Sequence, residues 1–410
     1  SRITGLDVIG GSRITGLDVT RGFAVMGILL MNIIAFAWPQ PVYTTPLAGG
    51  GSGPADLAIW AVNYVLVDSK FRGLFSMMFG ASALLVIDNA AASERSAARV
   101  HFARMGVLAL FGLLHFFFIW WGDILFLYAI CGMALFLFRD MTARALATTG
   151  SILIALHTCF YGASLLAMRT MNSPEIAASY ADFVSQFEPG SPAYAKEMAL
   201  YGGDYASIFM HRFIEIGSHP FSSIAQFGFE TLGLMLIGMA LFKGGLLAGQ
   251  WPPERMAMWR NRCLGLGLIA NSMLLIWLAT NGLDPWAVVM ATFVGSVPFN
   301  VIMSIGYAAL FMGLAQRFAG AEIIARVAAA GRAAFTNYIG TSLLMTSLFY
   351  GYGLGLFGEV SRTACYLFVV GAWMIMLLWS KPWLTRFAYG PLEWLWRSLA
   401  RWQVQPLRKN

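Results

Sequence analysis

Long apolar runs alternate with short polar segments along most of the chain. A helix needs about 20 consecutive apolar residues to cross a bilayer, and runs of this kind occur ten times in the sequence. The predicted spans are residues 18–38, 70–88, 105–121, 123–138, 146–168, 219–242, 263–282, 286–316, 332–352 and 362–380. The pattern therefore predicts an all-α fold, a polytopic membrane helix bundle.

The segments between the predicted spans differ in length and composition. Residues 169–218 form a long polar excursion with two Ser-Pro helix starts, which predicts a small helical cap. Residues 55–67 are apolar but too short to cross a bilayer, so we expect a helix at the interface or one leading into the second span. Pro298 within 286–316 favours a kink. The tail GPLEWLWRSLARW has the pattern of an interfacial cytoplasmic helix.

The octamer SRITGLDV occurs twice, at residues 1–8 and 12–19. Only the second copy runs into an apolar helix, because the first leads to two consecutive glycines that disfavour helix formation. Residues 1–11 are therefore expected to be a duplicated arm that folding does not need. The rest of the chain divides into an N-terminal membrane half (12–168), an extracytoplasmic helical insertion (169–218) and a C-terminal membrane half (219–410).

Composition and charge agree with a membrane protein. Hydrophobic residues make up 58% of the chain and charged residues only 11%, against about a quarter charged in soluble domains. The net charge of +7 comes from basic residues scattered between the apolar runs. That distribution fits the positive-inside rule and excludes a nucleic-acid-binding module, and it predicts that both termini are cytoplasmic. The four cysteines lie singly inside apolar runs, unlike a disulfide framework or a zinc site.

Polar side chains are costly in hydrocarbon, so each one inside a span indicates either a contact between helices or a functional site. Asp18 and Arg21 lie three residues apart at the start of the first span and can form an ion pair. Alternatively, Arg21 meets an anionic ligand. Asn32 lies about three turns farther along, close to the same helix face. Its amide either bonds to a neighbouring helix or donates to a developing oxyanion.

The second span begins with three charged residues, Asp68, Lys70 and Arg72, near the predicted outer boundary. Long basic side chains at such a boundary can place their charge in the interface while their stems stay in apolar surroundings. The same three groups could instead hold an anionic or sugar-like substrate. Both interpretations remain open at this stage.

His115 lies in the middle of an aromatic stretch, GLLHFFFIWWGDIL. Apolar surroundings favour the neutral imidazole, which can accept a proton, although a single histidine in a span is also a common packing group. Asp123 follows where the chain turns back into the membrane. Its carboxylate is expected either to cap the next helix or to pair with Lys70 and Arg72.

The ninth span opens with GRAAFTNYIGTS, which places Arg332 at the cytoplasmic edge and Asn337 and Tyr338 about one turn deeper. These groups either connect helices or form a pocket for a phosphate- or adenine-bearing ligand. Walker, zinc-protease, nucleophile-elbow and dinucleotide-binding motifs are absent from fitting contexts, which removes those enzyme classes.

Several stretches together resemble the YeiB family of bacterial inner-membrane proteins. They are RITGLDVTRGFAVMGILLMNI, KFRGLFSMMFGAS, GLLHFFFIWWGDILFLYAICG, GYAALFMG, GRAAFTNYIGTSLL and GPLEWLWRSL, and they occur along the whole chain. The resemblance implies a multi-pass protein of the bacterial inner membrane whose C-terminal half is a domain of unknown function.

The N-terminal part is similar to the transmembrane acyltransferase superfamily that includes heparan-α-glucosaminide N-acetyltransferase. The similarity is carried by LDVTRGFAVMGILLMN, with Asp18, Arg21, Gly22 and Asn32 at matching spacing. That enzyme places its catalytic histidine in the outer loop about eleven residues beyond the asparagine. This chain has Tyr43 there and no histidine before the second span, so a different base is expected.

The resemblance implies acyl transfer from cytoplasmic acyl-CoA, such as acetyl-CoA, to an envelope sugar or lipid headgroup. His115 would then act as base, Asn32 as oxyanion donor and Asp123 as a further catalytic group. Arg21 and Arg332, with Asn337 and Tyr338, are the expected contacts of the acyl donor.

The acceptor is expected near Asp68, Lys70, Arg72 and Tyr43, and no covalent cofactor or metal is expected. The alternative is a transporter or a lipid- or small-molecule-binding membrane protein without catalysis. Membrane lipids surround the protein in either case, and a homodimer is compatible with the sequence.

Overall fold

The computed structural model describes residues 15–49, 53–93, 96–171 and 173–409, and these residues form helices and no strand. The arm predicted over 1–11 lies outside the described residues. The first half of the chain contains α1 (Thr15–Ala37), α2 (Gln40–Thr44), α3 (Pro54–Leu66), α4 (Lys70–Ala92), α5 (Ala97–Phe118), α6 (Leu125–Phe138), α7 (Ala143–Thr170), α8 (Pro174–Ser185), α9 (Pro192–Tyr201), α10 (Tyr205–Met210) and the π-helix η1 (His211–Glu215). The second half contains α11 (His219–Lys243), α12 (Pro253–Thr280), α13 (Pro285–Met290), the π-helix η2 (Ala291–Gly295), α14 (Val297–Arg317), α15 (Glu322–Arg332), α16 (Ala334–Phe349), α17 (Arg362–Arg386) and α18 (Pro391–Arg401).

Eight helical segments of the described chain are long and apolar enough to cross a membrane. They are α1, the continuous segment of α3 and α4, α5, α7, α11, α12, α14 and α17. This confirms a polytopic helix bundle. The two remaining predicted spans form α6, of 14 residues, and α16, of 16 residues, both shorter than a bilayer requires of a single helix.

Two predicted irregularities are also present. Pro298 lies in the first turn of α14, and the chain before it forms the separate elements α13 and η2 instead of one long helix. The predicted short helix at 55–67 is α3, which leads into α4 through Ser69 in a left-handed conformation with φ of 61°. A non-glycine residue in that region marks a sharp local turn.

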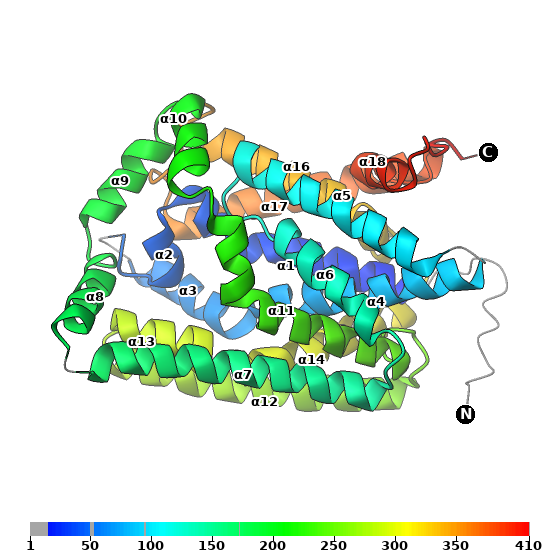
Figure 1. Cartoon of the computed structure of the whole chain (residues 1–410), viewed down its shortest axis with the longest axis horizontal. Coiled ribbons are helices and arrows are strands. Elements are labelled where there is room, and N and C mark those ends of the chain that lie inside the picture. The colour runs from blue at the N-terminus through cyan, green and yellow to red at the C-terminus, as the bar shows by residue number, and fades with distance from the viewer. Residues whose placement is uncertain (1–14, 50–52, 94–95, 172, 410) are drawn as a thin grey trace.

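Helix α1 occupies the centre of the bundle. In its most apolar stretch 78% of the residues are buried, against 17% for α7 and 22% for α12. Helices α4, α14, α15, α16 and α17 all pack against α1, whereas α7 and α12 run along one side of the molecule (Figure 1). The motif-bearing helix is therefore the interior one, and the outer helices present apolar side chains to lipid.

Glycines allow the central helices to approach one another closely. A Cβ added to Gly22 of α1 would lie 2.1 Å from the carbonyl oxygen of Val327, and one added to Gly331 of α15 would lie 1.9 Å from that of Asp18. Small residues are the usual means of close helix packing in membranes. The glycine of the motif thus sets the contact between α1 and α15.

The excursion predicted over 169–218 forms α8, α9, α10 and η1, which cluster at one end of the molecule (Figure 1). The C-terminal helix α18 lies toward the opposite end. The prediction of a small helical cap is confirmed, and the cap covers the end of the bundle at which α5 finishes, because Tyr205 donates a hydrogen bond to the carbonyl of Phe118 at 2.8 Å.

Candidate functional site

His115 and Asp123 form a buried pair where α5 turns into α6. Helix α5 ends at Phe118 and the chain reverses before α6 begins at Leu125, which brings Asp123 back beside His115. His115 Nδ1 lies 2.9 Å from Asp123 Oδ1, and the two side chains are 0% and 2% exposed. Asp123 Oδ2 accepts a hydrogen bond from the backbone N–H of Phe126 at 2.9 Å. One carboxylate therefore caps α6 and orients the imidazole.

The pairing determines which nitrogen of His115 can act as a base. An ionised carboxylate only accepts hydrogen bonds, so in a neutral imidazole paired with it Nδ1 carries the proton and Nε2 keeps its lone pair. Within the described residues, Nε2 of His115 is buried and has no hydrogen-bond partner. Buried polar atoms are usually paired, so this nitrogen is a candidate for contact with a reacting group.

Tyr338 and Asn32 connect this histidine to a small cavity. The ring of Tyr338 lies 5.3 Å from that of His115, centroid to centroid. Tyr338 and Asn32 both line a cavity with Phe36 and Ser342 that has a volume of about 10 Å³, enough for roughly one water molecule. Tyr338 therefore contacts His115 on the one hand and the cavity lined by Asn32 on the other.

The charged residues at the start of α4 have separate partners. Arg72 forms an ion pair with Glu230 of α11 at 2.7 Å, and Nε2 of His157 lies 3.9 Å from the other oxygen of Glu230. Lys70 is 1% exposed and donates hydrogen bonds to the carbonyl of Tyr64 and to Asn271. Asp123 is not a partner of Lys70 or Arg72 among these contacts. Of the two roles that the sequence suggested for its carboxylate, the structure therefore shows the capping of α6 and not the pairing with these cations.

Tyr43 of α2 and Asp68, which precedes α4, lie together. The hydroxyl of Tyr43 donates to Asp68 Oδ1 at 3.3 Å. Burial, and then the charge of Asp68, raises the pKa of Tyr43 well above its ordinary value. The phenol is therefore neutral at physiological pH, and Tyr43 does not supply a base.

The predicted ion pair at the start of α1 is present. Arg21 contacts Asp18 at 3.1 Å and also donates to the hydroxyl of Ser82 at 2.8 Å. Arg332 directly follows Gly331, whose backbone contacts that of Asp18. Arg21 and Arg332 therefore belong to one contact region, between α1 and α15.

The other two residues expected at the acyl donor lie elsewhere. Asn337 is 3% exposed, and its amide bonds to the Ala330 carbonyl, to Ser380 and to Trp379. These bonds join α15, α16 and α17, so Asn337 connects helices. Tyr338 faces His115. The structure thus does not bring Arg21, Arg332, Asn337 and Tyr338 into one pocket.

Glu393 is a polar group whose role the sequence did not indicate. It accepts hydrogen bonds from the backbone N–H groups of Phe335 and Thr336 at 2.8 and 3.1 Å and from the Thr336 hydroxyl at 2.6 Å. A carboxylate from α18 thus caps the first turn of α16. The signal in the sequence was one acidic residue in the first turn of an amphipathic helix, which does not reveal a partner 57 residues away.

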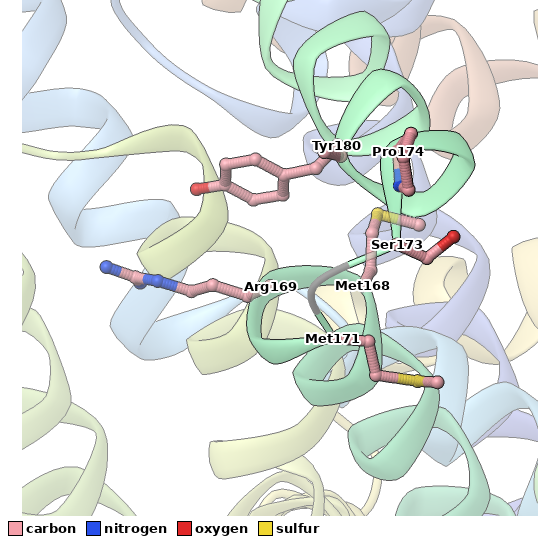
Figure 2. A pocket seen from close by; sticks show the side chains of 7 residues that line it. Met168, Arg169, Met171, Ser173, Pro174 and Tyr180 are labelled. Atoms are coloured by element: carbon pink, nitrogen blue, oxygen red, sulfur yellow. The ribbon is translucent and has the colours of Figure 1, made fainter.

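A larger open pocket of about 330 Å³ lies at the junction of α7 and α8. Figure 2 shows the sulfur atoms of Met168 and Met171 and the ring of Tyr180 around it. Its one cation, Arg169, stacks over Trp286 with 4.3 Å between the guanidinium carbon and the ring centroid. No histidine or carboxylate lines this pocket, so the His115 region is the better candidate for chemistry.

Comparison with known proteins places the chain among bacterial proteins of similar length. A family described as "Protein of unknown function (DUF418)" matches residues 241–403. The chain is 32% identical over 385 residues to the Escherichia coli (strain K12) "Uncharacterized protein YeiB", covering 92% of this chain and 93% of that protein. It is 28% identical over 408 residues to the Bacillus subtilis (strain 168) "Uncharacterized protein YxaH", covering 94% of each. No solved structure matches the chain.

Proposed function

The chain belongs to the YeiB family, and we propose that it is a membrane-bound acyltransferase of the bacterial inner membrane. The proposed reaction moves an acyl group, such as acetyl, from cytoplasmic acyl-CoA to a hydroxyl or amine of an envelope sugar or lipid headgroup. The observation that carries this proposal is the buried His115–Asp123 pair with an unpartnered Nε2.

A histidine oriented by a carboxylate is the usual arrangement of a general base that activates a nucleophile. Here Asp123 holds the proton of His115 on Nδ1, and the carboxylate is itself fixed by the Phe126 N–H. Burial of the pair excludes water that would compete with the acceptor. Asn32 and Tyr338 line one small cavity, and Tyr338 also packs against the imidazole.

The proposed reaction needs only the acceptor and the acyl-CoA, and every proton and bond is accounted for. The acceptor hydroxyl or amine gives its proton to His115 Nε2 as its oxygen or nitrogen bonds to the thioester carbonyl carbon. Asn32 donates a hydrogen bond to the oxyanion that forms. The carbon–sulfur bond then breaks, and the departing thiolate takes the proton from the imidazolium. The products are the acylated acceptor and free CoA. A base contributes about 10² to 10⁴-fold and an oxyanion donor about 10² to 10³-fold to such reactions.

The acyl donor is proposed to bind with its phosphates near Arg21 and Arg332. Arg21 and Asn32 are eleven residues apart on α1, which corresponds to about 16 Å along a helix axis. Only the extended pantetheine arm of CoA can cover that distance. The thioester would thus lie beside Asn32 while the nucleotide stays at the end of the helix that carries Arg21.

The test is transfer of label from acetyl-CoA to membrane extract by the purified full-length protein, compared with His115→Ala. We expect the variant to lose about 10²-fold or more in rate. His219→Phe is the matched control, because His219 is a half-buried histidine that stacks on Phe116, the neighbour of His115. A fully active His115→Ala protein would remove the assignment of the base.

A noncatalytic membrane transporter is the second candidate, and one cluster favours it. Arg72, Glu230 and His157 lie within the spans α4, α11 and α7 and contact one another in the interior. Ionisable groups inside spans often line ion or proton pathways. Thermal-shift binding of CoA separates the two candidates, since a protein that binds neither CoA nor acetyl-CoA favours transport.

A further inference from the structure

Arg212 is a fully buried cation between the cap and the end of α5. It lies in the π-helix η1 and is 0% exposed. Its Nη1 donates to the carbonyl oxygens of Phe116 and Phe117 at 3.4 and 3.3 Å. Within the described chain, its Nε and Nη2 atoms are buried and have no hydrogen-bond partner.

The two unpartnered nitrogens are the ones that recognise oxyanions. Nε and Nη2 lie on one edge of the planar guanidinium, and their N–H bonds point in the same direction. That edge forms paired, parallel hydrogen bonds with two oxygens of a carboxylate or phosphate. Nη1 of Arg212 thus donates to the backbone of α5, whereas the edge formed by Nε and Nη2 has no partner among the described residues.

The charge of Arg212 has no counterion in the described residues. No carboxylate forms an ion pair with it. The nearby Tyr201 is neutral, because burial and then Glu197 raise the pKa of Tyr201 well above its ordinary value. Glu197 itself accepts a hydrogen bond from the backbone of Gln40. A buried charge without a partner is strongly unfavourable, so the site is incomplete as it stands.

Other unpartnered donors border the same region. Among the residues that the structure describes, the hydroxyl of Tyr350 and the indole nitrogen of Trp120 are buried and have no hydrogen-bond partner. Both residues belong to the hydrophobic cluster that includes Tyr201, and Tyr350 lies within electrostatic range of Arg212. Three side chains from different parts of the chain therefore each have a buried N–H or O–H donor without a partner among the described residues. π-Helices such as η1 are frequent at functional sites.

We infer that the free edge of Arg212, together with the hydroxyl of Tyr350, binds an oxyanion, a phosphate or carboxylate group, beneath the cap. Phe116, whose carbonyl accepts a hydrogen bond from Arg212, directly follows His115, so the anion site lies at the same end of α5 as the base. The acceptor is accordingly an anionic molecule, and this last step rests on the proposed function.

The test is binding of oxyanions to the full-length protein without any acyl donor. In an uncharged detergent, thermal unfolding is followed during titration with inorganic phosphate or acetate, with glycerol as the neutral control. In a second arm the protein is placed in nanodiscs of phosphatidylcholine with or without phosphatidic acid, which carries an accessible phosphate. We expect saturable stabilisation in at least one arm. Stabilisation by phosphate or acetate identifies a soluble anion, and stabilisation by phosphatidic acid alone identifies a lipid headgroup.

Four variants locate the effect. Arg212→Gln should abolish the stabilisation and Arg212→Lys should weaken it, since lysine keeps the charge but lacks the paired edge. Tyr350→Phe should weaken binding about tenfold, as expected for one hydrogen bond to a charged group, and should leave the unliganded protein as stable as before, because its hydroxyl has no partner to lose. Lys196→Gln is the control, a cap cation whose side chain is 62% exposed.

The inference is overturned if no oxyanion stabilises the protein in either arm. It is also overturned if Arg212→Gln binds the oxyanion as tightly as the wild type. If Arg212→Gln fails to fold, Tyr350→Phe is used instead, and wild-type affinity in that variant overturns the inference. His115→Ala separates this result from the proposed function. Binding that persists in His115→Ala and disappears in Arg212→Gln supports the anion site whether or not acyl transfer is observed.

Discussion

Replacing Asp123 with asparagine tests the chemistry of the His115 pair without changing its size. In the wild type Asp123 Oδ2 accepts the Phe126 N–H and Oδ1 accepts the Nδ1–H of His115, both at 2.9 Å. The asparagine carbonyl can still cap α6, but its amide nitrogen then faces His115. Because an amide N–H only donates, Nδ1 must become the acceptor and the proton moves to Nε2. The nitrogen proposed to act as base is then blocked.

The magnitude follows from what is lost. A blocked base removes about 10² to 10⁴-fold from the rate of transfer. The free energy of unfolding should fall by only about 1–2 kcal/mol, since a hydrogen bond to a charged group contributes about 1.5–3 kcal/mol and a neutral one about 1 kcal/mol. Asp123→Ala should cost about 2 kcal/mol more, because it also removes the remaining hydrogen bond to His115 and the cap of α6.

Two measurements check this reasoning. Initial rates of acetyl transfer from labelled acetyl-CoA should place Asp123→Asn near the level of His115→Ala. Thermal unfolding in detergent should rank the wild type above Asp123→Asn, and Asp123→Asn above Asp123→Ala. An Asp123→Asn protein within about threefold of the wild-type rate would show that the proton position on His115 is irrelevant. An Asp123→Asn protein less stable than Asp123→Ala would refute the proposed retention of the cap.

Two further predictions concern the packing around α1 and α16. Burial raises the pKa of Glu393 above its ordinary value of 4.5, so the folded state holds this proton more tightly than the unfolded state. The contribution of Glu393 to stability is therefore complete below pH 4.5 and is lost as the pH rises through the raised pKa. Unfolding temperatures from pH 4.5 to 8 should fall more steeply for the wild type than for Glu393→Gln, and parallel curves would contradict this. Gly331→Ala should destabilise the protein by at least about 1–3 kcal/mol, because its Cβ would lie 1.9 Å from the Asp18 carbonyl oxygen. Gly371→Ala is the control, because no described atom lies within 4 Å of the added Cβ, and it should leave stability unchanged or increase it. Unfolding temperatures and size-exclusion profiles of the two variants check this prediction.

The periodicity and length of the apolar runs were sufficient to predict the helices. Every predicted span is helical, although 286–316 is divided among α13, η2 and α14, since a backbone in hydrocarbon must satisfy its own hydrogen bonds. The break at Pro298 and the ion pair between Asp18 and Arg21 were also predictable, because both depend on residues close together in the sequence. The lengths of α6 and α16 could not be predicted, because an apolar run can continue beyond the residues that form a helix.

The sequence singled out His115 and Asp123 separately, as a costly polar residue in a span and a carboxylate at a chain reversal. It left two roles open for Asp123, and only the turn between α5 and α6 shows that the carboxylate caps α6 and meets the imidazole. Tyr338 is a similar case. Its position on a helix was evident, but its neighbour was not, because helical periodicity specifies a face and not the helix that packs against it.

What the sequence by itself determined is therefore the set of helices, the cap and the polar residues that the membrane makes costly. Tertiary structure decided which of those residues meet: Arg72 with Glu230, Asn337 with Trp379, and Tyr338 with His115. Arg212 acquires significance only there, since the sequence shows an arginine in an amphipathic segment while packing buries it completely. The physical reason is that a membrane span depends on the length of one continuous apolar run. The cost of burying a polar side chain in a membrane, in contrast, is offset by hydrogen-bond or ion-pair partners from distant parts of the chain.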